Sequence, residues 1–325
     1  MYPFYRIFHP EVFQGRHKRR NYFEGWYYKL IDEKRKNALA IIPGVSFGKD
    51  GKHAHAFIQV LNSENQVNYI RYPISEFEFD QKEFRIRIGD NYFSKDSLSL
   101  KIHRKEIEIE GELLFNDIIS LPKSLLRPGI MGIFSYIPYM ECYHGLINMH
   151  HRIIGKLSIL GDCIDFTKGY GYIEKDWGKS FPESWIWIQS NHFHGDDVTL
   201  MFSAAMIPWL TTSFPGFISF LRLGQEIYVF ATYTGAHLKK LEYEGNQVNI
   251  LLYDRRHILS LKAKHSTGGS LKAPKNGQMN RDIIESINGN VNVTLKDHHG
   301  NILYQGKGTN TGLEIEKQIF IEFKK

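Results

Sequence analysis

Apolar and polar residues alternate with a period of two along most of the chain, which is the pattern of half-buried strands. In the first half the alternation covers residues 77–79, 84–88, 98–102 and 107–109. Short polar turns such as Asp80-Gln81-Lys82 separate these runs. Strands joined by tight turns pair with their neighbours in sequence, so the pattern predicts an antiparallel meander with one buried face.

The second half of the chain repeats this behaviour. Alternating runs at residues 248–252, 259–263 and 291–295 are again separated by polar turns. Helical periodicity is scarce, and residues 280–287 form the best short helix candidate. Many short strands at even spacing are typical of barrels and sandwiches, so we predict an all-β fold of two antiparallel barrel or sandwich domains.

A weak internal repeat supports a division into two domains. Residues 23–30 (FEGWYYKL) can be aligned with residues 182–189 (PESWIWIQ), and each copy reads Glu-x-Trp at the start of an apolar strand. The repeat predicts two similar β-domains, residues 1–180 and residues 181–325. Chance similarity between two aromatic-rich strands is the alternative interpretation.

Composition adds an excess of aromatic residues to this picture. The 325 residues include 5 Trp, 18 Tyr and 22 Phe, and such residues favour strands and apolar cavities. The two cysteines, Cys142 and Cys163, exclude a disulfide scaffold and a four-cysteine zinc site, and we predict them to be buried thiols.

Charge does not indicate a nucleic-acid partner. The net charge is +6, and the one dense basic cluster is the sequence RHKRR at residues 16–20. No nucleic-acid-binding motif accompanies that cluster, so we interpret it as a solvated arm and expect no nucleic acid as a partner.

Neither a secretory signal nor a transmembrane helix is expected, which predicts a cytoplasmic protein. Two apolar stretches, residues 120–147 and 207–223, are broken by Pro, Gly and Arg. We predict buried loops or the rim of a cavity there. Docking to the surface of a membrane is the alternative interpretation.

Four of the five tryptophans lie beside carboxylates in two clusters, residues 22–28 and residues 169–189. Burial among rings raises the pKa of a carboxyl group, which can then hold and donate a proton near neutral pH. Ring faces also stabilise a carbocation. A purely structural role is the alternative, because tryptophans often fill the mouth of a barrel and carboxylates often bind backbone amides.

The second cluster resembles the tocopherol cyclase family. The matching stretch is YIEKDWGKSFPESWIWIQSNHF at residues 172–193, and FEGWY at residues 23–27 matches the other signature of the family. Weaker similarities occur at residues 271–274, 281–282 and 311–314. The resemblance therefore extends over nearly the whole chain from about residue 20.

The resemblance implies a fold and a reaction. Related proteins, including carotenoid hydratases, have two lipocalin-like barrels. The plant and cyanobacterial cyclases close a prenylated hydroquinone to a chromanol, a reaction that needs neither a redox cofactor nor a metal. A proton is added to the prenyl double bond, and the phenol oxygen traps the tertiary cation. The enzyme class implied is an intramolecular lyase or isomerase, with a hydrophobic small molecule as the substrate.

Specific residues acquire expected roles from this resemblance. We expect an elongated apolar pocket between or within the barrels, with Glu24, Glu174 and Asp176 as candidate proton donors. The residues expected to line the cavity and stabilise cationic charge are Trp26, Tyr27, Trp177, Trp185 and Trp187. Gln189 and Asn191 are expected to hold a quinol hydroxyl.

Departures from the plant pattern leave the substrate open. Asp176 replaces an Asn, Lys179-Ser180 replaces a pair of glycines, and residues 214–220 are more apolar than the plant counterpart. The segment between the two signatures is also shorter. A non-catalytic carrier of a lipid or quinone remains an alternative, as does a hydratase or isomerase of the carotenoid type.

Histidine pairs are a weaker signal. His53 with His55, and His192 with His194, place two imidazoles on one strand face, as many metal sites do. No third ligand can be identified, so we predict partly exposed strand histidines and no metal. His144 and the pair His150-His151 remain ambiguous. The absence of GxSxG, P-loop and GxGxxG motifs argues against serine hydrolases and nucleotide-dependent enzymes.

Overall fold

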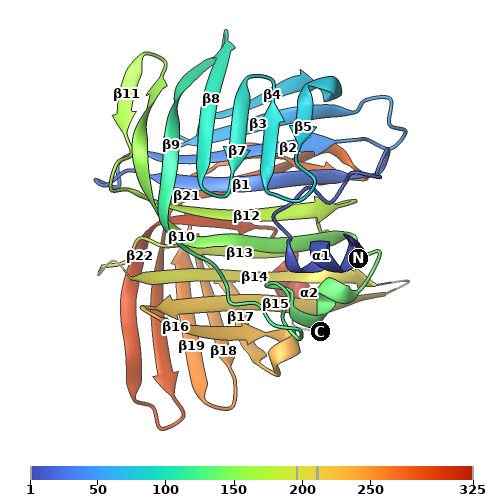
Figure 1. Ribbon diagram of the computed structural model, residues 1–325. Helices are drawn as coiled ribbons and strands as arrows, with labels where there is room; N and C mark the ends of the chain where they lie inside the picture. The colour runs from blue at the N-terminus through green and yellow to red at the C-terminus, as the bar shows by residue number, and fades with distance from the viewer. Residues whose placement is uncertain (1, 195–196, 210–211, 324–325) are drawn as a thin grey trace. The chain divides into compact units, whose positions relative to one another are not determined.

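The computed structural model describes residues 2–194, 197–209 and 212–323, and nearly all of its regular structure is β. Two antiparallel sheets account for the strands, so the predicted all-β class is confirmed (Figure 1). Contacts divide the chain into two compact units. Unit 1 comprises residues 1–181 and 270–282, and unit 2 comprises residues 182–269 and 283–325.

Unit 1 is built on a 12-stranded sheet whose order is β4-β3-β2-β1-β12-β10-β9-β8-β7-β6-β5, with β11 paired to β10. The strands are β1 (Phe23–Ile31), β2 (Ala38–Ser46), β3 (His55–Asn62), β4 (Val67–Pro73), β5 (Phe77–Phe79), β6 (Arg85–Ile88), β7 (Asn91–Ser94), β8 (Ser97–Arg104), β9 (Ile107–Ile119), β10 (Cys142–Ile159), β11 (Asp162–Asp165) and β12 (Tyr170–Gly178).

The predicted meander is present as β5 to β9, and alternation places its apolar residues on one side. Ile86, Leu100 and Ile109, for example, are buried, while the charged residues between them are exposed. The buried residues join a single hydrophobic cluster that also includes Trp26 and Tyr28 of β1. The curved sheet therefore surrounds one core, and the side of each strand that faces it is called the core face below.

Unit 2 has a 10-stranded sheet with the order β16-β15-β14-β13-β22-β21-β19-β18-β17, and β20 pairs with β21. The strands are β13 (Trp185–Ser190), β14 (Val198–Trp209), β15 (Thr212–Leu223), β16 (Glu226–Ala231), β17 (His237–Glu244), β18 (Gln247–Tyr253), β19 (His257–Lys264), β20 (Gly269–Lys275), β21 (Gln278–Asp297) and β22 (Ile302–Ile315). The buried apolar residues of this unit form a second hydrophobic cluster.

The weak sequence repeat corresponds to a repeat in topology. Strands β1 to β4 form a four-stranded meander, and so do β13 to β16. The first strand of each meander also pairs with the last strand of its own sheet, β1 with β12 and β13 with β22. The two Glu-x-Trp sequences therefore lie at or just before equivalent strands.

Three predictions about elements need correction. Residues 280–287 lie within strand β21, because its apolar residues pack in a sheet rather than along one helical stripe. Residues 270–282 belong to unit 1, although the sequence repeat assigned them to the second domain. Within unit 1 this segment is held by Gln59, whose side-chain oxygen accepts the Lys272 amide at 2.7 Å. Cys163 is exposed, because it lies on the short edge strand β11.

The helical elements are short, and the sequence pattern did not reveal them. They are α1 (Tyr2–Phe8), α2 (Ile319–Glu322) and the 3-10 turns η1 (Ile74–Glu76), η2 (Gly132–Tyr136) and η3 (Thr232–Thr234). Among the described residues, no helix has both the length and the apolar character needed to cross a bilayer.

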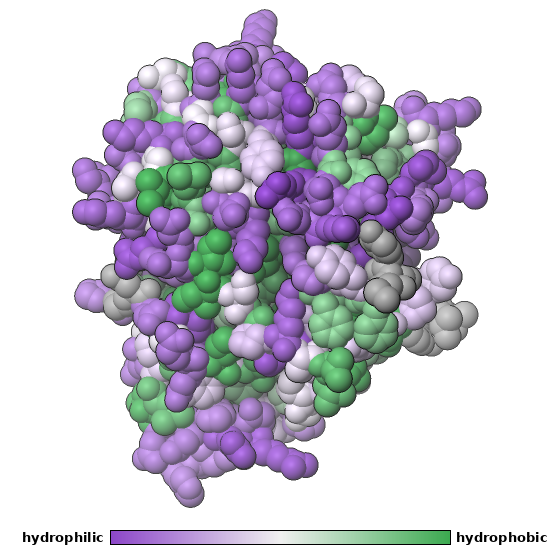
Figure 2. All heavy atoms as spheres, in the orientation of Figure 1, coloured by the Kyte–Doolittle hydropathy of each residue, from purple (hydrophilic) through white to green (hydrophobic). Residues whose placement is uncertain are grey.

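The apolar stretch at residues 120–147 is only partly buried. Leu121, Ile130 and Met140 are buried as predicted, but Leu125 and Tyr139 are exposed. Apolar residues reach the surface in the region of α1 in the view of Figure 2. The other stretch, residues 207–223, forms the end of β14 and most of β15, and residues 210–211 within it lie outside the described part of the chain.

Candidate active site

Strand β12 lies at the centre of the candidate site because it pairs with β1 on one side and with β10 on the other. Successive side chains of a strand point to opposite faces. Lys175 and Trp177 therefore point to the core face, whereas Glu174 and Asp176 point to the opposite face, which we call the outer face. Two different ionic arrangements result, one on each side of the same strand.

On the outer face, His144 of β10 lies opposite Asp176 in the strand register. Its Nδ1 is 2.9 Å from Oδ1 of Asp176, and its Nε2 is 3.5 Å from Oε2 of Glu174. The imidazole thus bridges two carboxylates that are two residues apart on β12. Only 15% of the His144 side chain and 6% of the Glu174 side chain are exposed, so solvent screens this arrangement little.

Tyr172 extends the arrangement along β12. Its hydroxyl donates a hydrogen bond of 2.5 Å to Oε2 of Glu174. Burial and the neighbouring Glu174 carboxylate raise the pKa of Tyr172 well above its ordinary value, so the phenol keeps its proton. His144, Tyr172, Glu174 and Asp176 are called the His144 cluster below.

The charge of His144 follows from its two neighbours. Burial lowers the pKa of the imidazole, but the carboxylates of Asp176 and Glu174 raise it by more, and the net result is a pKa of about 9. The imidazole is therefore protonated at neutral pH. Its Nδ1 is hydrogen-bonded to Asp176, whereas Nε2 is buried near Glu174 without a hydrogen-bond partner among the described residues. The cluster holds a proton and two proton acceptors within one partly buried site.

The thiol of Cys142 also lies near this cluster, two residues before His144 on β10. Burial, followed by the charges of Asp176 and Glu141, raises its pKa well above the ordinary value. Cys142 is therefore a neutral thiol. It was predicted to be buried, and in the structure it is partly buried.

Glu24 lies apart from the other two predicted acids. It belongs to the core face, where its side chain is fully buried and its carboxylate is 2.5 Å from Nζ of Lys175. It also accepts hydrogen bonds from the Gln14 and Gly15 amides and from the Tyr22 hydroxyl. The carboxylate oxygens of Glu24 thus all have hydrogen-bond or ion-pair partners within the protein. This favours a structural role for Glu24.

Lys175 completes the arrangement on the core face. Its ammonium donates to the carbonyl oxygens of Pro10 and Val12, at 2.7 Å and 2.6 Å. Burial lowers the pKa of Lys175, the ion pair with Glu24 raises it, and the result is about 8. Lys175 and Glu24 together fix the backbone of residues 10–15 against the sheet. We call this pair with its backbone partners the N-terminal clamp.

Trp26 and Trp177 contact the clamp. The Lys175 ammonium lies 4.6 Å from the ring centroid of Trp26 and 5.0 Å from that of Trp177. Trp26 is fully buried and also stacks on Phe84. The cation beside these two rings is thus a lysine of the protein itself. Their predicted contact with a ligand stays a prediction.

The remaining predicted aromatic residues are divided between the units. Tyr27 of β1 lies opposite Glu174 in register, so it borders the His144 cluster on the outer face. Trp185, Trp187, Gln189 and Asn191 belong to unit 2. Alternation along β13 places Trp187 and Gln189 on the face opposite to the buried core residues Ile186 and Ile188.

Sequence reasoning left His144 as an ambiguous residue, and it proves central to the outer-face site. The sequence motif Glu174-Lys175-Asp176 indicated the two carboxylates but not the imidazole between them. His144 is brought there by the pairing of β10 with β12, and that pairing includes register shifts that a single sequence does not reveal.

A metal ion is a second occupant that the cluster could accept. One ligand atom from each of His144, Glu174 and Asp176 lies within 4.8 Å of the other two. An imidazole and two carboxylates suit a divalent cation. Binding would require His144 to lose its proton, so metal and proton would compete for this site.

His150 and His151 do not join the cluster. A β-bulge region in β10 separates them from His144, and the His151 ring is fully buried against Phe115. Burial and the neighbouring His150 hold the pKa of His151 well below its ordinary value, so this imidazole is neutral.

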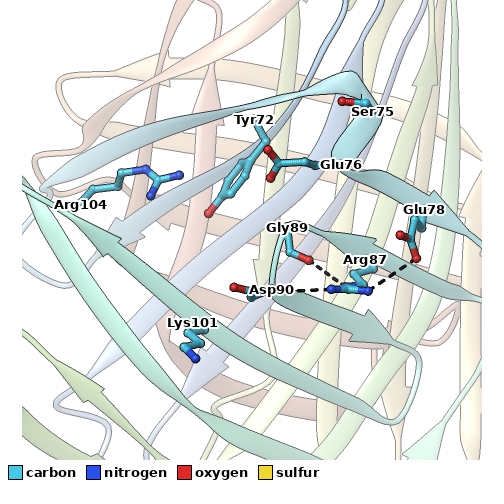
Figure 3. A pocket seen from close by; sticks show the side chains of 9 residues that line it. All are labelled: Tyr72, Ser75, Glu76, Glu78, Arg87, Gly89, Asp90, Lys101 and Arg104. Atoms are coloured by element: carbon cyan, nitrogen blue, oxygen red, sulfur yellow. Dashed lines mark hydrogen bonds and ion pairs between the residues drawn. The ribbon is translucent and has the colours of Figure 1, made fainter.

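A hollow of about 360 Å³ in unit 1 differs from the apolar pocket expected from the sequence. It is lined by charged and polar groups, among them Glu76, Arg87 and Arg104. Figure 3 shows Glu76 and Arg104 on either side of the Tyr72 ring. Arg87 is held by Glu78 and Asp90 at the rim. The hollow is suited to water and ions, and it contains none of the predicted site residues.

Comparison with known proteins identifies the family. The family model described as tocopherol cyclase-like matches residues 121–316. The chain belongs to the tocopherol cyclase-like family. The matched region includes β10 and β12, and therefore every residue of the His144 cluster.

Curated relatives of this tocopherol cyclase-like protein are distant. It is 25% identical over 158 residues to a probable tocopherol cyclase from rice, Oryza sativa, which covers 49% of this chain and 29% of the rice protein. It is 30% identical over 83 residues to tocopherol cyclase from maize, Zea mays, covering 26% of this chain and 17% of the maize protein. The alignments thus span less than a third of either relative.

Solved structures share the fold. CghA has a TM-score of 0.58 with 10% identity, and the alignment covers 91% of this chain and 88% of CghA. A candidate AttH protein from Nitrosomonas europaea has a TM-score of 0.54 with 13% identity, covering 92% and 93% of the two chains. At these identities the similarity establishes the architecture of the tocopherol cyclase-like protein and not its activity.

The N-terminal clamp makes a first prediction. Replacing Glu24 with Gln leaves Lys175 buried without its counter-charge, which costs about 3–5 kcal/mol in comparable cases. We expect a lower thermal midpoint and faster hydrogen exchange of the Gln14 and Gly15 amides, measured by mass spectrometry. Glu33→Gln, at an exposed pair with Lys168, is the control. Equal exchange in the two variants would contradict the clamp.

The pKa of His144 makes a second prediction. Its folded value of about 9 lies above the ordinary value of 6.5, so its stabilising contribution is complete below pH 6.5 and is lost as pH rises through 9. The contribution is at most about 3 kcal/mol. We therefore expect the thermal midpoint of the native protein to fall by several degrees more than that of His144→Gln between pH 6.5 and pH 9.5.

A matched control exists on the surface of unit 1. His103 lies between Glu108 and Glu110, at 3.2 Å and 3.8 Å, and 46% of its side chain is exposed. Solvent screens such pairs, so His103→Gln should retain the pH dependence of the native protein. If His103→Gln and His144→Gln show the same pH dependence, the pKa assigned to His144 is wrong.

Proposed function

We propose that this protein is an acid–base catalyst of the tocopherol cyclase type. Its reaction would be the cyclisation of a prenylated hydroquinone or a related isoprenoid, with addition of a hydroxyl group to a carbon–carbon double bond. The observation that carries the proposal is the His144 cluster, in which a protonated imidazole lies between two carboxylates on a partly buried sheet face. Membership of the tocopherol cyclase-like family supports the substrate class.

The reaction needs both a proton donor and a proton acceptor. A proton is added to the less substituted carbon of the prenyl double bond, and a tertiary cation forms at the other carbon. The phenol oxygen attacks that cation, a carbon–oxygen bond forms, and the phenol proton leaves. The His144 cluster can supply the first proton and accept the last one, so the protein returns to its starting state without a co-reactant.

Charge stabilisation is the second requirement. A protonated imidazole with a pKa of about 9 is a weak acid towards an alkene. The negative charges of Glu174 and Asp176 must therefore stabilise the cation as it forms, and they are effective because the site is poorly solvated. Tyr27, which lies opposite Glu174 in the strand register, adds an aromatic ring beside the same site.

Asp176 has a particular place in this proposal. The resemblance to plant cyclases places Asn at this position, and Asp here accepts the closest hydrogen bond of His144. Asp176 therefore sets the protonation of His144, and the substrate or pH range of this protein would differ from those of the plant enzymes. Binding of a lipid or quinone without turnover is the alternative function, and the same experiment separates the two.

The proposal predicts catalysis with a defined isotope pattern. A purified sample incubated with a prenylated hydroquinone in D₂O should form a chromanol with one carbon-bound deuterium, detected by liquid chromatography and mass spectrometry. His144→Gln, Glu174→Gln and Asp176→Asn should each lose at least about 100-fold in kcat, the usual contribution of general acid–base groups.

The control for this assay is the exposed pair of His103 and Glu108. Glu108→Gln should keep the native rate. Native mass spectrometry with the hydroquinone measures binding in each variant. Binding without any chromanol would support a carrier. Full turnover in all three variants of the His144 cluster would remove the cluster from the mechanism. Turnover that appears only after addition of a divalent metal would assign the cluster to a metal ion.

We also propose that unit 1 docks to a membrane surface, where isoprenoid substrates are concentrated. Leu125, Leu126 and Tyr139 expose 74%, 76% and 93% of their surfaces, and Lys123 and Arg127 lie in the same loop. Exposed aliphatic residues beside basic ones suit the interface of an anionic bilayer. The loop is ordered by the Tyr136 hydroxyl, which donates to the Leu125 carbonyl at 2.6 Å.

Docking predicts a loss of vesicle binding on removal of these side chains. Each leucine transferred into the bilayer contributes roughly 1.5–3 kcal/mol, so Leu125→Ser with Leu126→Ser should weaken binding at least 10-fold. Sedimentation with phosphatidylcholine–phosphatidylglycerol vesicles measures this. Ile302→Ser with Leu303→Ser, an exposed apolar pair of unit 2, is the control. Unchanged binding in the leucine variant would contradict docking through this loop.

A further inference from the structure

Arg222 of unit 2 exposes only 1% of its surface. Such complete burial is unusual for an arginine. It lies on β15, paired with Thr199 of β14 and with Ile227 of β16. The neighbouring Leu221 belongs to the hydrophobic core, so Arg222 is directed to the opposite face of the sheet.

Of the three guanidinium nitrogens of Arg222, one has hydrogen-bond partners within the described part of the chain. Nη1 donates to Oδ1 of Asp197 at 2.6 Å and to the Gly224 carbonyl at 2.7 Å. Nε and Nη2 are buried without a hydrogen-bond partner among the described residues. The Thr199 hydroxyl on the paired strand is also buried, and no partner for it is found in that part of the chain. Unsatisfied buried donors are costly, and donors of a guanidinium are among the most costly.

The unsatisfied groups form a recognisable arrangement. The N–H groups of Nε and Nη2 lie along one edge of the planar guanidinium and point in the same direction. That edge matches the two oxygens of a carboxylate, or two oxygens of a phosphate, in a bidentate hydrogen bond. The Thr199 hydroxyl is directly across the strand pair and can supply a third hydrogen bond.

Asp197 does not block this edge. Its carboxylate binds Nη1, and 65% of its side chain is exposed, so its charge is largely screened by solvent. The guanidinium therefore keeps attraction for a second anion on its free edge.

The neighbours of Arg222 on this face indicate the rest of the ligand. The adjacent row of the sheet contains Gln189, Met201, Phe220 and Val229. Rows on one face are about 7 Å apart, so these side chains lie within reach of a group bound at Arg222. Most of them are apolar, and they suit a hydrocarbon more than a sugar.

We propose that Arg222 and Thr199 bind the carboxylate or phosphate head group of an amphipathic ligand. The apolar part of the ligand would contact Met201 and Phe220. All the residues named for this site belong to unit 2. The proposal does not rest on the catalytic role proposed for the His144 cluster. A neutral prenylated hydroquinone offers no such head group, so the proposal adds a class of ligand.

Binding of matched isoprenoids to the full-length protein tests the site. Farnesoate and farnesyl monophosphate carry the two acidic head groups, and farnesol has the same hydrocarbon with a neutral one. Isothermal titration calorimetry at constant ionic strength gives Kd for each. We expect one of the acids to bind at least 10-fold more tightly than farnesol, and the tighter acid identifies the head group.

Variants assign the binding to Arg222. Arg222→Gln should remove the preference for the acid while leaving the affinity for farnesol unchanged. Thr199→Val should weaken binding of the acid by a smaller factor. Arg222→Lys retains the positive charge but loses the paired donors, so it should bind the acid more weakly than the native protein does. Arg256→Gln, at an exposed arginine of unit 2, is the control.

Two results would overturn the proposal. Equal affinity of the native protein for farnesol and both acids would show that no acidic head group is recognised. An acid preference that persists in Arg222→Gln would place the recognition elsewhere. Thermal midpoints and circular dichroism verify that each variant is folded. If Arg222→Gln does not fold, Arg222→Lys and Thr199→Val provide the test. This experiment measures binding and not chromanol formation. A failure of the proposed head-group site is therefore distinct from a failure of the proposed catalysis.

Discussion

The alternation of side chains along β12 is the constraint on which the rest of unit 1 depends. If Glu174 and Asp176 point away from the core, Lys175 between them must point into it. A buried ammonium is costly without a counter-charge, and Glu24 of the adjacent strand provides one at 2.5 Å. The acidic outer face and the buried ion pair are therefore two consequences of a single strand with the sequence Glu-Lys-Asp.

This constraint also links the beginning of the chain to the candidate active site. Residues 10–15 supply the remaining hydrogen-bond partners of Glu24 and Lys175, so the N-terminal segment is held by the strand that carries Glu174 and Asp176. On the core face, Glu24 and Lys175 each have several hydrogen-bond partners. We expect these partners to restrain β12 and so to preorganise the His144 cluster on its outer face.

The alternation of apolar residues was sufficient to predict the all-β fold and the meander of β5 to β9, and the clustering of carboxylates beside tryptophans indicated Glu174 and Asp176. It could not predict which strands pair over long distances. Glu24 and Glu174 looked equivalent in sequence, because each lies beside a tryptophan, yet β1 and β12 direct them to opposite faces. His144 could not be placed because the register of β10 contains shifts. The apparent helix at residues 280–287 failed because a short apolar run can pack equally well in a sheet.

The comparison with known proteins fits this view of fold and site. The architecture is shared with proteins of very low sequence identity, such as CghA. The family match instead covers β10 to β22, the part of the chain that includes the His144 cluster. The architecture therefore tolerates wide variation in sequence. We expect the chemistry to depend on the few polar groups on the face of β12 that points away from the core.

The protonation of His144 is the central claim, and NMR measures it directly. Long-range ¹H–¹⁵N spectra of the imidazole nitrogens, assigned with His144→Gln, can be followed from pH 6 to pH 10. We predict that both ring nitrogens carry protons at pH 7.5 and that His144 titrates with a pKa near 9. A neutral imidazole at pH 7.5, or a pKa at or below 6.5, would contradict the account.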